Sequence, residues 1–408
     1  MNLVSGDLFW TSINRIPNSY TYLTENIDCD IVIIGGGVTG ALCAYYLTKA
    51  GINVVLVDKN IIGYGSTSAS TSILQYEIDN NLIGLKNHIG INNSVDCFNL
   101  CQKSLYDIDK IINEMDDKCN FNIKDCFYYS NKESDVPMLK KEYALRKEHG
   151  FNVELFDDNS SDKFSFPFKA GIYSKNSAGE IDPYKFTHSL ISTSVKQKLR
   201  VYENTLVTSL KSQIDGVTVV TKNKFKIRAK KAIIATGYEA KKFISKKIVT
   251  LTRTFAVVTK PINEFKGWYN RAIIRDTNDF YSYLRVTDDN RIIIGGEDLE
   301  IGGERSKVSN LKDDDPLAGE KYTILTNRLK ALFPQIPNIE VDFGYSALFG
   351  DTKDSLPYIG EYEDIPNCYF CLGYGSNGIL YAVFGAQFLR DLYLGNPPKE
   401  LNLFRIDR

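Results

Sequence analysis

Three glycines with the spacing G-x-G-x-x-G stand in the segment from Cys29 to Lys59, which reads CDIVIIGGGVTGALCAYYLTKAGINVVLVDK. Gly35 permits a turn that needs a free φ angle, Gly37 lets the backbone approach a pyrophosphate, and Gly40 lets a helix lie close to a strand. A helix that begins here directs unpaired N–H groups and its positive end at phosphates. The pattern predicts a site for an adenine dinucleotide and does not by itself separate NAD from FAD.

The elements around these glycines follow the order strand, helix, strand. The apolar run 31–34 precedes the glycines, a helical segment follows to Ala50, and the apolar run 54–57 ends at Asp58. Asp58 stands where an acidic residue accepts hydrogen bonds from the ribose hydroxyls. A lone glycine motif is also typical of any strand-loop-helix connection, but here strand, helix and acid agree on a dinucleotide-binding unit.

Two further stretches of small residues are expected beside the same cofactor. GYGSTSASTSILQYEID, from Gly63 to Asp79, has the composition of a flexible linker, but its position after Asp58 favours a loop against the cofactor. KAIIATG, at 231–237, is an apolar strand that ends in small residues, which let the chain pass close by. With no second dinucleotide fingerprint in the chain, this stretch favours FAD over NAD.

A second glycine turn, Gly373 to Gly378, lies near the end of the chain. The apolar run CYFCL leads into it, and a helix is predicted from there toward Leu394, before Gly-Asn-Pro ends it. A helix N-terminus aimed at the N1/C2 carbonyl edge of a flavin would stabilise the negative charge of the reduced ring.

Alternation in the segment FYSYLRV places Tyr281, Tyr283 and Arg285 on one face of a predicted strand. Such a face suits a substrate wall, and it equally suits a solvated sheet face. As a wall, the two tyrosines would orient the substrate and Arg285 would bind a carboxylate if the substrate is an amino acid. His188 lies in a predicted helix after an Asp-Pro turn and is expected to be structural.

Length and composition are those of a globular protein with more than one domain-sized unit. The chain has 408 residues, and its 49 Lys and Arg nearly balance its 50 Asp and Glu. This balance argues against nucleic acid as the main partner. The absence of a secretory signal pattern and of a long apolar span predicts a cytoplasmic protein without a transmembrane segment.

The eight cysteines are expected to be reduced, because nothing else marks a secreted chain. Cys368 and Cys371 form a C-x-x-C in an extended run, where an offset of three points the side chains to opposite faces. They are therefore interpreted as packed thiols and not as a redox or metal pair. No metal site is expected.

Other segments carry weaker patterns. The first 28 residues, with Phe9 and Trp10, are expected either to pack across the fold or to form a partly ordered tail. A helical pattern runs from Leu82 to Asn120, and charged residues at 132–149 indicate another, exposed helix. Short strands are predicted at 199–203, 206–210, 217–221 and 225–229, and alternating strands between 250 and 341. The acidic run 313–315 is expected to be a solvated loop.

Taken together, these motifs resemble the D-amino-acid-oxidase-like (DAO) family of FAD-dependent oxidoreductases, which includes glycine oxidase, sarcosine oxidase and γ-glutamylputrescine oxidase. The resemblance covers nearly the whole chain and rests on DIVIIGGGVTGALCAYYL with VVLVDK, GYGST, GEIDPYKF, KAIIATG and SLPYIG…PNCYFCLGYGSNGI. It implies an α/β fold with an α+β substrate part. A GR2-type, Rossmann-like FAD domain would comprise residues 1–85, 175–250 and 342–408, and an antiparallel-sheet substrate domain residues 86–174 and 251–341.

The resemblance also implies which residues contact FAD. The first glycine turn would meet the pyrophosphate, Asp58 the adenosine ribose, and the last glycine turn the pyrimidine edge of the flavin. The residues implied are Gly35, Gly37, Val38, Thr39, Gly40, Asp58, Lys59, Gly65, Ser66, Thr67, Val207, Ala235, Thr236, Gly237, Gly373, Tyr374, Gly375, Ser376, Asn377, Gly378 and Ile379.

Several positions depart from the family pattern. Members with covalent flavin carry a cysteine where this chain has Ala347, so the FAD is expected to be non-covalent. Sarcosine oxidases hold the substrate carboxylate with a lysine and an arginine at the positions of Leu380 and Gln75. Their oxygen-promoting lysine would fall in the IIIGG strand, which carries none. These departures argue against the sarcosine binding mode and against oxygen as the electron acceptor.

The activity implied is two-electron oxidation of the C–N bond of a primary or secondary amine or amino acid, by hydride transfer to flavin N5, with hydrolysis of the imine in water. A dehydrogenase that passes electrons to a quinone or protein acceptor is an alternative. A flavoprotein with a binding role or a role in nucleic-acid modification is another. The expected partners are a small amine or amino acid and an acceptor, oxygen or quinone; the oligomeric state is left open.

Overall fold

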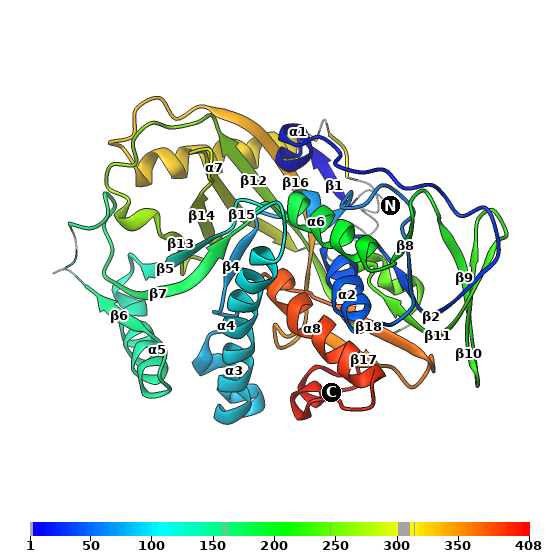
Figure 1. The fold of residues 1–408 in the computed structure, drawn as a ribbon. Coiled ribbons are helices and arrows are strands. Elements are labelled where there is room, and N and C mark those ends of the chain that lie inside the picture. Colours follow the sequence, from blue (N-terminus) through cyan, green and yellow to red (C-terminus); the bar gives the residue numbers. More distant parts are fainter. Residues whose placement is uncertain (1–2, 158–159, 161, 245, 301–310, 314) are drawn as a thin grey trace.

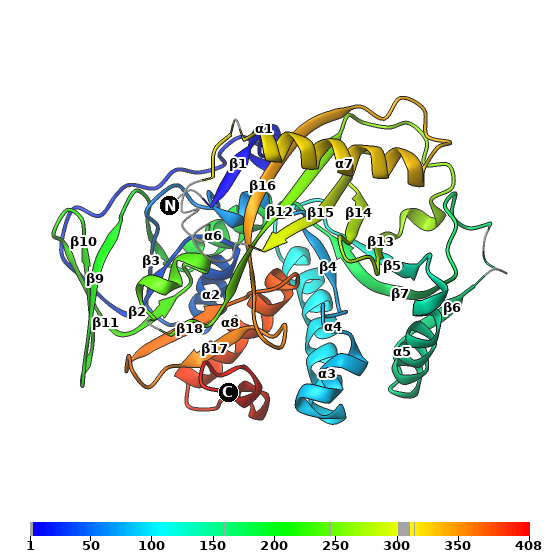
Figure 2. The same ribbon diagram turned by 180° about the vertical axis from the view of Figure 1, so that it is seen from behind.

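The computed structural model describes residues 3–157, 160, 162–244, 246–300, 311–313 and 315–408. Two β-sheets of mixed strand direction form the framework, and helices cover their outer faces (Figure 1). The opposite view shows helix α7 lying along the outside of the larger sheet, above strands β12 and β14 to β16 (Figure 2). The fold is therefore α/β, as the sequence predicts.

The eight-stranded sheet has the order β17-β18-β11-β2-β3-β8, and off this path β10 pairs with the first part of β11 and with β9. Neighbours from β18 to β8 run parallel. Strands buried on both faces read as continuous apolar runs, and all four residues of the VVLV strand β3 are buried. The strands are β2 Ile27–Ile34, β3 Val54–Val57, β8 Arg200–Tyr202, β9 Val207–Gln213, β10 Gly216–Thr221, β11 Lys226–Ile234, β17 Tyr358–Glu361 and β18 Cys368–Leu372.

The ten-stranded sheet has the order β1-β16-β12-β15-β14-β13-β5-β7-β4, and β6 pairs with β7. Side chains alternate between the two faces of its strand β12. Phe255 and Val257 join the core beneath α7, whereas Thr254 and Ala256 line a cavity on the other face. The strands are β1 Val4–Gly6, β4 Ile73–Gln75, β5 Asn122–Ser130, β6 Val153–Phe156, β7 Ala170–Glu180, β12 Thr250–Thr259, β13 Ile273–Asp276, β14 Ser282–Val286, β15 Ile292–Glu300 and β16 Val341–Asp351.

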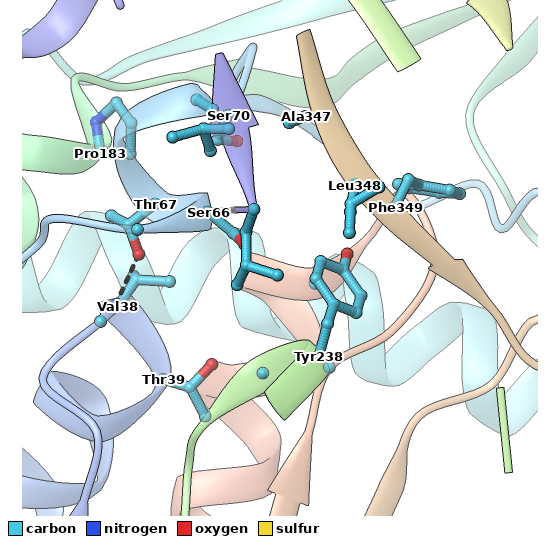
Figure 3. Close-up of a pocket in the computed structure, with 18 of the residues that line it drawn as sticks. Val38, Thr39, Ser66, Thr67, Ser70, Pro183, Tyr238, Ala347, Leu348 and Phe349 are labelled. Atoms are coloured by element: carbon cyan, nitrogen blue, oxygen red, sulfur yellow. Dashed lines mark hydrogen bonds between the residues drawn. The ribbon is translucent and has the colours of Figure 1, made fainter. Parts of the chain in front are cut away.

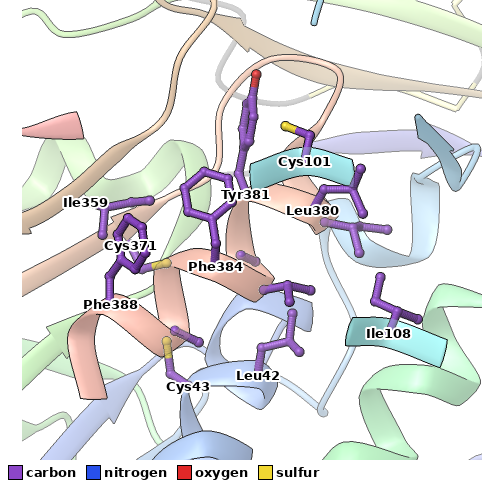
Figure 4. Packing of buried hydrophobic residues seen from close by; sticks show 14 of the residues in the cluster. Leu42, Cys43, Cys101, Ile108, Ile359, Cys371, Leu380, Tyr381, Phe384 and Phe388 are labelled. Carbon is purple, nitrogen blue, oxygen red and sulfur yellow. The ribbon is translucent and has the colours of Figure 1, made fainter. Parts of the chain in front are cut away.

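The described part of the chain contains eight α-helices, which surround the sheets. Helix α2 packs against both α6 and α8, and Figure 4 shows Leu42 and Cys43 of α2 beneath Phe384 of α8 in the buried core. The helices are α1 Phe9–Ile13, α2 Val38–Lys49, α3 Leu82–Ile89, α4 Ile91–Asn113, α5 Val136–Glu148, α6 Pro183–Lys196, α7 Pro316–Leu332 and α8 Gly378–Tyr393.

Several local predictions are confirmed. The order β2-α2-β3 reproduces the predicted strand-helix-strand unit. Asp182 caps α6 by accepting the N–H groups of Tyr184 and Lys185. Cys368 and Cys371 pack in two different cores on opposite faces of β18, and both are free thiols.

Two kinds of feature are absent from the described ranges: they contain no group of side chains placed to hold a metal ion, and none of their helices has the length and hydropathy of a membrane span.

Other local predictions are corrected. The long helical region is broken at Gly90, whose φ of +79° ends α3. The strands expected at 225–229 and in KAIIATG are one strand, β11. The last residue of the acidic run 313–315 is not part of a solvated loop, because Asp315 caps α7 and pairs with Arg253. Residue 314 lies outside the described residues.

The helix expected to be exposed, α5, buries two charged side chains completely. Glu142 and Arg146 are both 0% exposed, and they pair with each other on the inner face of the helix. Burial of a charge is tolerated where a partner compensates it, and the sequence does not show that partner. The N-terminal segment packs across the fold, because β1 pairs with β16 and Phe9 and Trp10 are buried.

The predicted division into an FAD domain and a substrate domain stays a prediction. The ten-stranded sheet joins β1, β4 and β16 to strands of residues 122–300, so it contains segments from both predicted domains.

Candidate active site

A cavity of about 650 Å³ lies between the two sheets. The first glycine turn, the serine-rich loop 63–72 and the last glycine turn line it from the side of the smaller sheet. Strands β5 and β12 to β16 of the larger sheet, with Tyr281 just before β14, contribute its other wall, called the roof below. Of the residues expected to contact the cofactor, all except Gly40 and Asn377 line this cavity.

The first glycine turn leaves no space for side chains. Gly35 has a φ of +112°, and a Cβ atom there would lie 2.4 Å from the carbonyl oxygen of Ala235 on the neighbouring strand. A Cβ atom on Gly40 would lie 1.9 Å from the carbonyl oxygen of Gly35. Gly40 therefore acts through packing, because it lets α2 start directly against the turn.

The N-terminus of α2 meets the serine-rich loop at the cavity wall. The N–H of Val38 donates a 3.1 Å hydrogen bond to Oγ1 of Thr67 (Figure 3). A Cβ atom on Gly37 would lie 3.0 Å from the same oxygen. Thr39 and Ser66 also border the cavity beside this contact (Figure 3). The wall thus presents a helix start and hydroxyl groups, which suit a pyrophosphate.

Asp58 lies at the end of β3 with both carboxylate oxygens bonded to the backbone. The N–H groups of Gly36 and Asn60 donate to it at 2.6 and 2.7 Å. Burial raises the pKa of Asp58, and these two hydrogen bonds oppose the rise. The carboxylate also borders the cavity. Each of its oxygens keeps a lone pair that can accept a hydrogen bond from a ribose hydroxyl.

The last glycine turn also borders the cavity. Gly375 has a φ of +82°, and its N–H donates to the carbonyl oxygen of Gly350 at 2.8 Å. Tyr374 donates to the carbonyl oxygen of Gly237 at 3.0 Å, which ties this turn to the end of β11. Asn377 is not among the lining residues, and its side chain donates to the backbone carbonyls of Gln75 and Glu77, at 3.0 Å each. The 16-residue helix α8 starts directly after this turn.

Tyr281 and Tyr283 both border the cavity at the roof. Their ring centroids are 5.9 Å apart, and Tyr281 donates a 2.7 Å hydrogen bond to Oδ2 of Asp298. Oδ1 of Asp298 is buried and has no hydrogen-bond partner in the described part of the chain. Burial raises the pKa of Asp298, the interactions with the hydroxyl groups of Thr254 and Tyr281 oppose the rise, and the charge of Asp79 adds to it.

Arg285 is not brought to the cavity, although it shares a strand with Tyr283. Its side chain is 2% exposed, its Nε donates to the carbonyl oxygen of Thr71 at 2.7 Å, and its guanidinium lies over the ring of Trp10. Nη1 lies 3.5 Å from the carboxylate of Glu180. These contacts occupy the guanidinium behind the serine-rich loop, so it is not retained as a carboxylate-binding residue.

The sequence interpretation missed several lining residues of the roof, among them Asp298, Tyr128 and Arg275. Arg275 of β13 pairs in register with Tyr283 of β14 and with Tyr128 of β5. The alternation of RAIIRD contains Arg275, but the register between strands so far apart in sequence is not visible in the sequence. His188, expected to be structural, is buried, and burial lowers its pKa to about 4.

The lining residues fit FAD. Thr236 carries a buried hydroxyl, facing the cavity wall, without a partner among the described residues. The glycine cradle, the start of α2 and the hydroxyls of Ser66 and Thr67 suit the pyrophosphate. The start of α8 suits the electron-rich edge of the flavin. Lys59 and Lys242, the lysines of this lining, both pair with Glu239.

Relatives with assigned names match along most of the chain. A putative Rieske 2Fe-2S iron-sulfur protein of Bacillus subtilis is 24% identical, over 95% of this chain and 72% of its own length. The γ-glutamylputrescine oxidoreductase of Escherichia coli is 22% identical over 92% of this chain and 85% of its own. The glycine oxidase of Bacillus licheniformis is 23% identical over 93% and 97%.

Solved structures share the fold at low sequence identity. Glycine oxidase from Geobacillus kaustophilus superposes with a TM-score of 0.78 and 19% identity, over 93% of this chain and 99% of that one. L-proline dehydrogenase from P. horikoshii superposes with a TM-score of 0.77 and 20% identity, over 94% and 98%. The model of the family described as FAD dependent oxidoreductase matches residues 30–392. The chain therefore belongs to the DAO family of FAD-dependent oxidoreductases, and FAD is its cofactor.

Proposed function

We propose that this protein oxidises the C–N bond of a primary or secondary amine or amino acid to an imine, which then hydrolyses in water. The observation that carries this proposal is Oδ1 of Asp298, a buried oxygen without a hydrogen-bond partner among the described residues, in a roof that continues the FAD cavity. When bound, FAD supplies the two-electron acceptor that the chemistry requires. The protein supplies the position, the hydrogen bonds and the exclusion of water.

Asp298 is the proposed acceptor for an N–H of the substrate amine. A buried carboxylate oxygen without a partner is costly, and a substrate N–H would satisfy it. Tyr281 holds the other oxygen of this carboxylate, so the acceptor has a fixed orientation. Tyr283 is held in turn through a 3.2 Å contact between its hydroxyl and that of Thr254. The two rings would confine the amine against the cofactor.

The relatives support this reaction class through their names, which include a glycine oxidase and a γ-glutamylputrescine oxidoreductase. The test is anaerobic mixing of the yellow holoprotein with a panel of primary amines, secondary amines and amino acids. Bleaching of the flavin absorption band by at least one of these compounds is expected, with the corresponding carbonyl compound and ammonia or amine as products. Bleaching by 2-hydroxy acids or alcohols alone would contradict the proposal.

A dehydrogenase that passes electrons to a quinone or a protein acceptor is the second candidate. Strand β15, where family oxidases carry an oxygen-promoting lysine according to the resemblance above, reads IIIGGEDLE and has no lysine. One relative carries the name of a putative Rieske 2Fe-2S iron-sulfur protein, and Rieske centres are redox-active clusters. Reoxidation of the reduced protein by air and by a soluble quinone separates the candidates: an oxidase reoxidises rapidly in air, whereas the dehydrogenase needs the quinone.

A further inference from the structure

Strand β15 contains a β-bulge at the residues that bring a carboxylate to the roof. It runs antiparallel to β12, and the register between the two strands shifts between Arg253 and Phe255 of β12. One residue of β12 there lies opposite two residues of β15, Glu297 and Asp298. An extra residue of this kind bends its strand and changes the direction of the side chains that follow.

The bulge reverses which side chains of β15 face the cavity. Before it, Ile292 and Ile294 belong to the core beneath α7, whereas Ile293 shares a cluster with cavity-lining residues of β12 and β16. Unbroken alternation would turn Glu297 to the cavity and Asp298 to α7. The structure has the opposite arrangement, because Glu297 pairs with side chains of α7 and Asp298 borders the cavity.

The backbone of the bulge is strained at Glu297. Its φ is +58°, in the left-handed region, where a residue with a Cβ atom persists only if its surroundings hold it. Gly296, just before it, has a φ of +137°, and a Cβ atom there would lie 2.1 Å from the carbonyl oxygen of Tyr281. The chain that carries Tyr281 therefore lies directly against the bulge.

Two cationic side chains of α7 hold Glu297 in this conformation. Nζ of Lys321 donates to Oε2 of Glu297 at 2.9 Å, and Nη2 of Arg328 donates to Oε1. The Glu297 side chain is 5% exposed, so a turn of this residue away from α7 would leave a buried charge without its partners. The ion pairs thus stabilise the strained backbone that directs the next side chain into the cavity.

Arg328 also holds the chain that leads into Tyr281. Its Nη1 donates to the carbonyl oxygen of Phe280 at 2.9 Å. The residues just before Tyr281 and just before Asp298 are therefore bonded to the same guanidinium. On the cavity side, the 2.7 Å hydrogen bond from Tyr281 to Asp298 joins the two segments again.

We propose that Glu297, held by Arg328 and Lys321, is the positioning residue for the amine-binding carboxylate of Asp298. Glu297 is not among the described residues that line the cavity, so it acts through Asp298 and does not touch the substrate. This inference rests on the proposed function for the role of Asp298 alone.

The test measures the binding of an amine that cannot be oxidised. tert-Butylamine has no hydrogen on the carbon bonded to nitrogen, so it cannot give up a hydride, and tert-butanol has a similar shape without the charge. Each is titrated into the holoprotein while the flavin absorption spectrum is followed. Asp298→Asn should weaken the binding of tert-butylamine by at least about 10-fold and leave that of tert-butanol within about twofold.

Glu297→Ala should have a smaller effect of the same kind. Alanine keeps the strained backbone position and loses both ion pairs, so tert-butylamine should bind at least about fivefold more weakly, with tert-butanol unchanged within about twofold. Glu297→Gly should recover part of the loss, because glycine adopts a positive φ without strain. If Glu297→Ala fails to fold, Glu297→Gln, which keeps the size and removes the charge, decides the question by a selective loss of tert-butylamine affinity.

Glu320→Gln is the matched control, because Glu320 lies next to Lys321 in α7 and is exposed. It should bind both probes as the wild type does. The double variant Glu297→Ala with Asp298→Asn separates positioning from general structural support. Because Glu297 acts through Asp298, the double variant should bind tert-butylamine within about twofold of Asp298→Asn alone.

Three outcomes would overturn the inference, even if amines bleach the flavin: wild-type affinity of Glu297→Ala for tert-butylamine, an equal loss for both probes, or losses that simply multiply in the double variant. If Asp298→Asn bound tert-butylamine as the wild type does, the inference and the proposed role of Asp298 would both be wrong. If the probes behave as expected but no amine or amino acid bleaches the flavin, the proposed function fails and the positioning role stands.

Discussion

Tyr281 and Asp298 are joined by a 2.7 Å hydrogen bond at the roof of the FAD cavity, and the second oxygen of that carboxylate is buried with no partner in the part of the chain that the structure describes. A tyrosine that fixes a carboxylate also limits how far the carboxylate can turn to find another donor. The bond therefore prepares one acceptor position for a ligand N–H.

Asp298→Asn is expected to lower kcat/KM for amine oxidation by about 10- to 100-fold, because a hydrogen bond to a charged group is replaced by a neutral one. Tyr281→Phe should cost about fivefold, since the carboxylate remains but loses its orientation. Both variants should keep normal FAD content, measured by the ratio of flavin to protein absorbance. A kcat/KM equal to that of the wild type in Asp298→Asn would contradict the role of this carboxylate.

The same carboxylate should give activity a dependence on acidic pH. Its pKa is raised above the ordinary aspartate value, first by burial and then by the charge of Asp79. Protonation removes the acceptor, so kcat/KM should fall as the pH falls through this raised pKa, at a higher pH than an exposed aspartate would give. Stopped-flow flavin reduction between pH 4 and 8 measures this fall at acidic pH, and the Asp298→Asn variant should not show it.

The cofactor side of the site was accessible from the sequence because its parts are local. The turn at Gly35 to Gly40 and its partner acid Asp58 lie within one strand-helix-strand unit, where spacing determines geometry. The substrate side was not accessible in the same way. Tyr281 and Tyr283 were found by alternation within one strand, whereas Arg275 reaches them only through pairing between strands.

Arg285 illustrates the limit of alternation as a guide to function. Alternation gave the face of the strand correctly, since Tyr283 and Arg285 are two residues apart. It did not give the position of the serine-rich loop, whose Thr71 carbonyl and the nearby Trp10 ring occupy the Arg285 guanidinium. The burial of Glu142 and Arg146 in α5 was not predictable for a similar reason. A charged helix face is usually solvated, and the compensating partner Glu77 lies elsewhere in the chain.

Gly40→Ala should cost the protein its cofactor and part of its stability. The added Cβ atom would lie 1.9 Å from the carbonyl oxygen of Gly35, and this neighbour is backbone that cannot rotate away. Overpacking of this kind costs about 1–3 kcal/mol, although alanine is the better residue for a helix interior. Urea unfolding of the holoprotein and its flavin-to-protein absorbance ratio measure both effects.

Gly319→Ala is the matched control for that variant. Gly319 also lies in a helix, α7, and no atom lies within 4 Å of an added Cβ there. The substitution should stabilise the protein by about 0.5–1 kcal/mol and leave FAD content unchanged. If Gly40→Ala and Gly319→Ala had the same FAD content and the same free energy of unfolding, the prediction would be wrong. The short distance to the Gly35 carbonyl would then not be the reason for glycine at position 40.

The FAD should be released when the protein is denatured by acid. Ala347, the position at which the resemblance places a flavin-linking cysteine, borders the cavity and has a methyl group that cannot form a thioether (Figure 3). Precipitation with trichloroacetic acid should leave a colourless pellet and a yellow supernatant. A yellow pellet would reveal a covalent bond through another residue, and peptide mapping would locate it.

Asp351, at the end of β16, should make stability depend on pH. Its pKa is raised to about 6, mainly by burial and further by the charges of Asp79 and Asp298, against the 3.0 Å hydrogen bond from Thr252. The folded state therefore holds this proton more tightly than the unfolded chain, in which the pKa is about 3.8. This contribution to stability is fully present below about pH 4 and is lost as the pH rises through about 6.

Asp351→Asn keeps an oxygen for the Thr252 hydroxyl and removes the charge, so it should raise Tm by about 2 °C or more at pH 8 and leave Tm unchanged at pH 4. Asp116→Asn is the control, because the Asp116 side chain is 94% exposed and its removal should leave the difference from wild type independent of pH. Thermal unfolding of the holoprotein at both pH values gives the comparison. A gain of equal size at pH 4 and pH 8 would show that packing, and not ionisation of Asp351, is responsible.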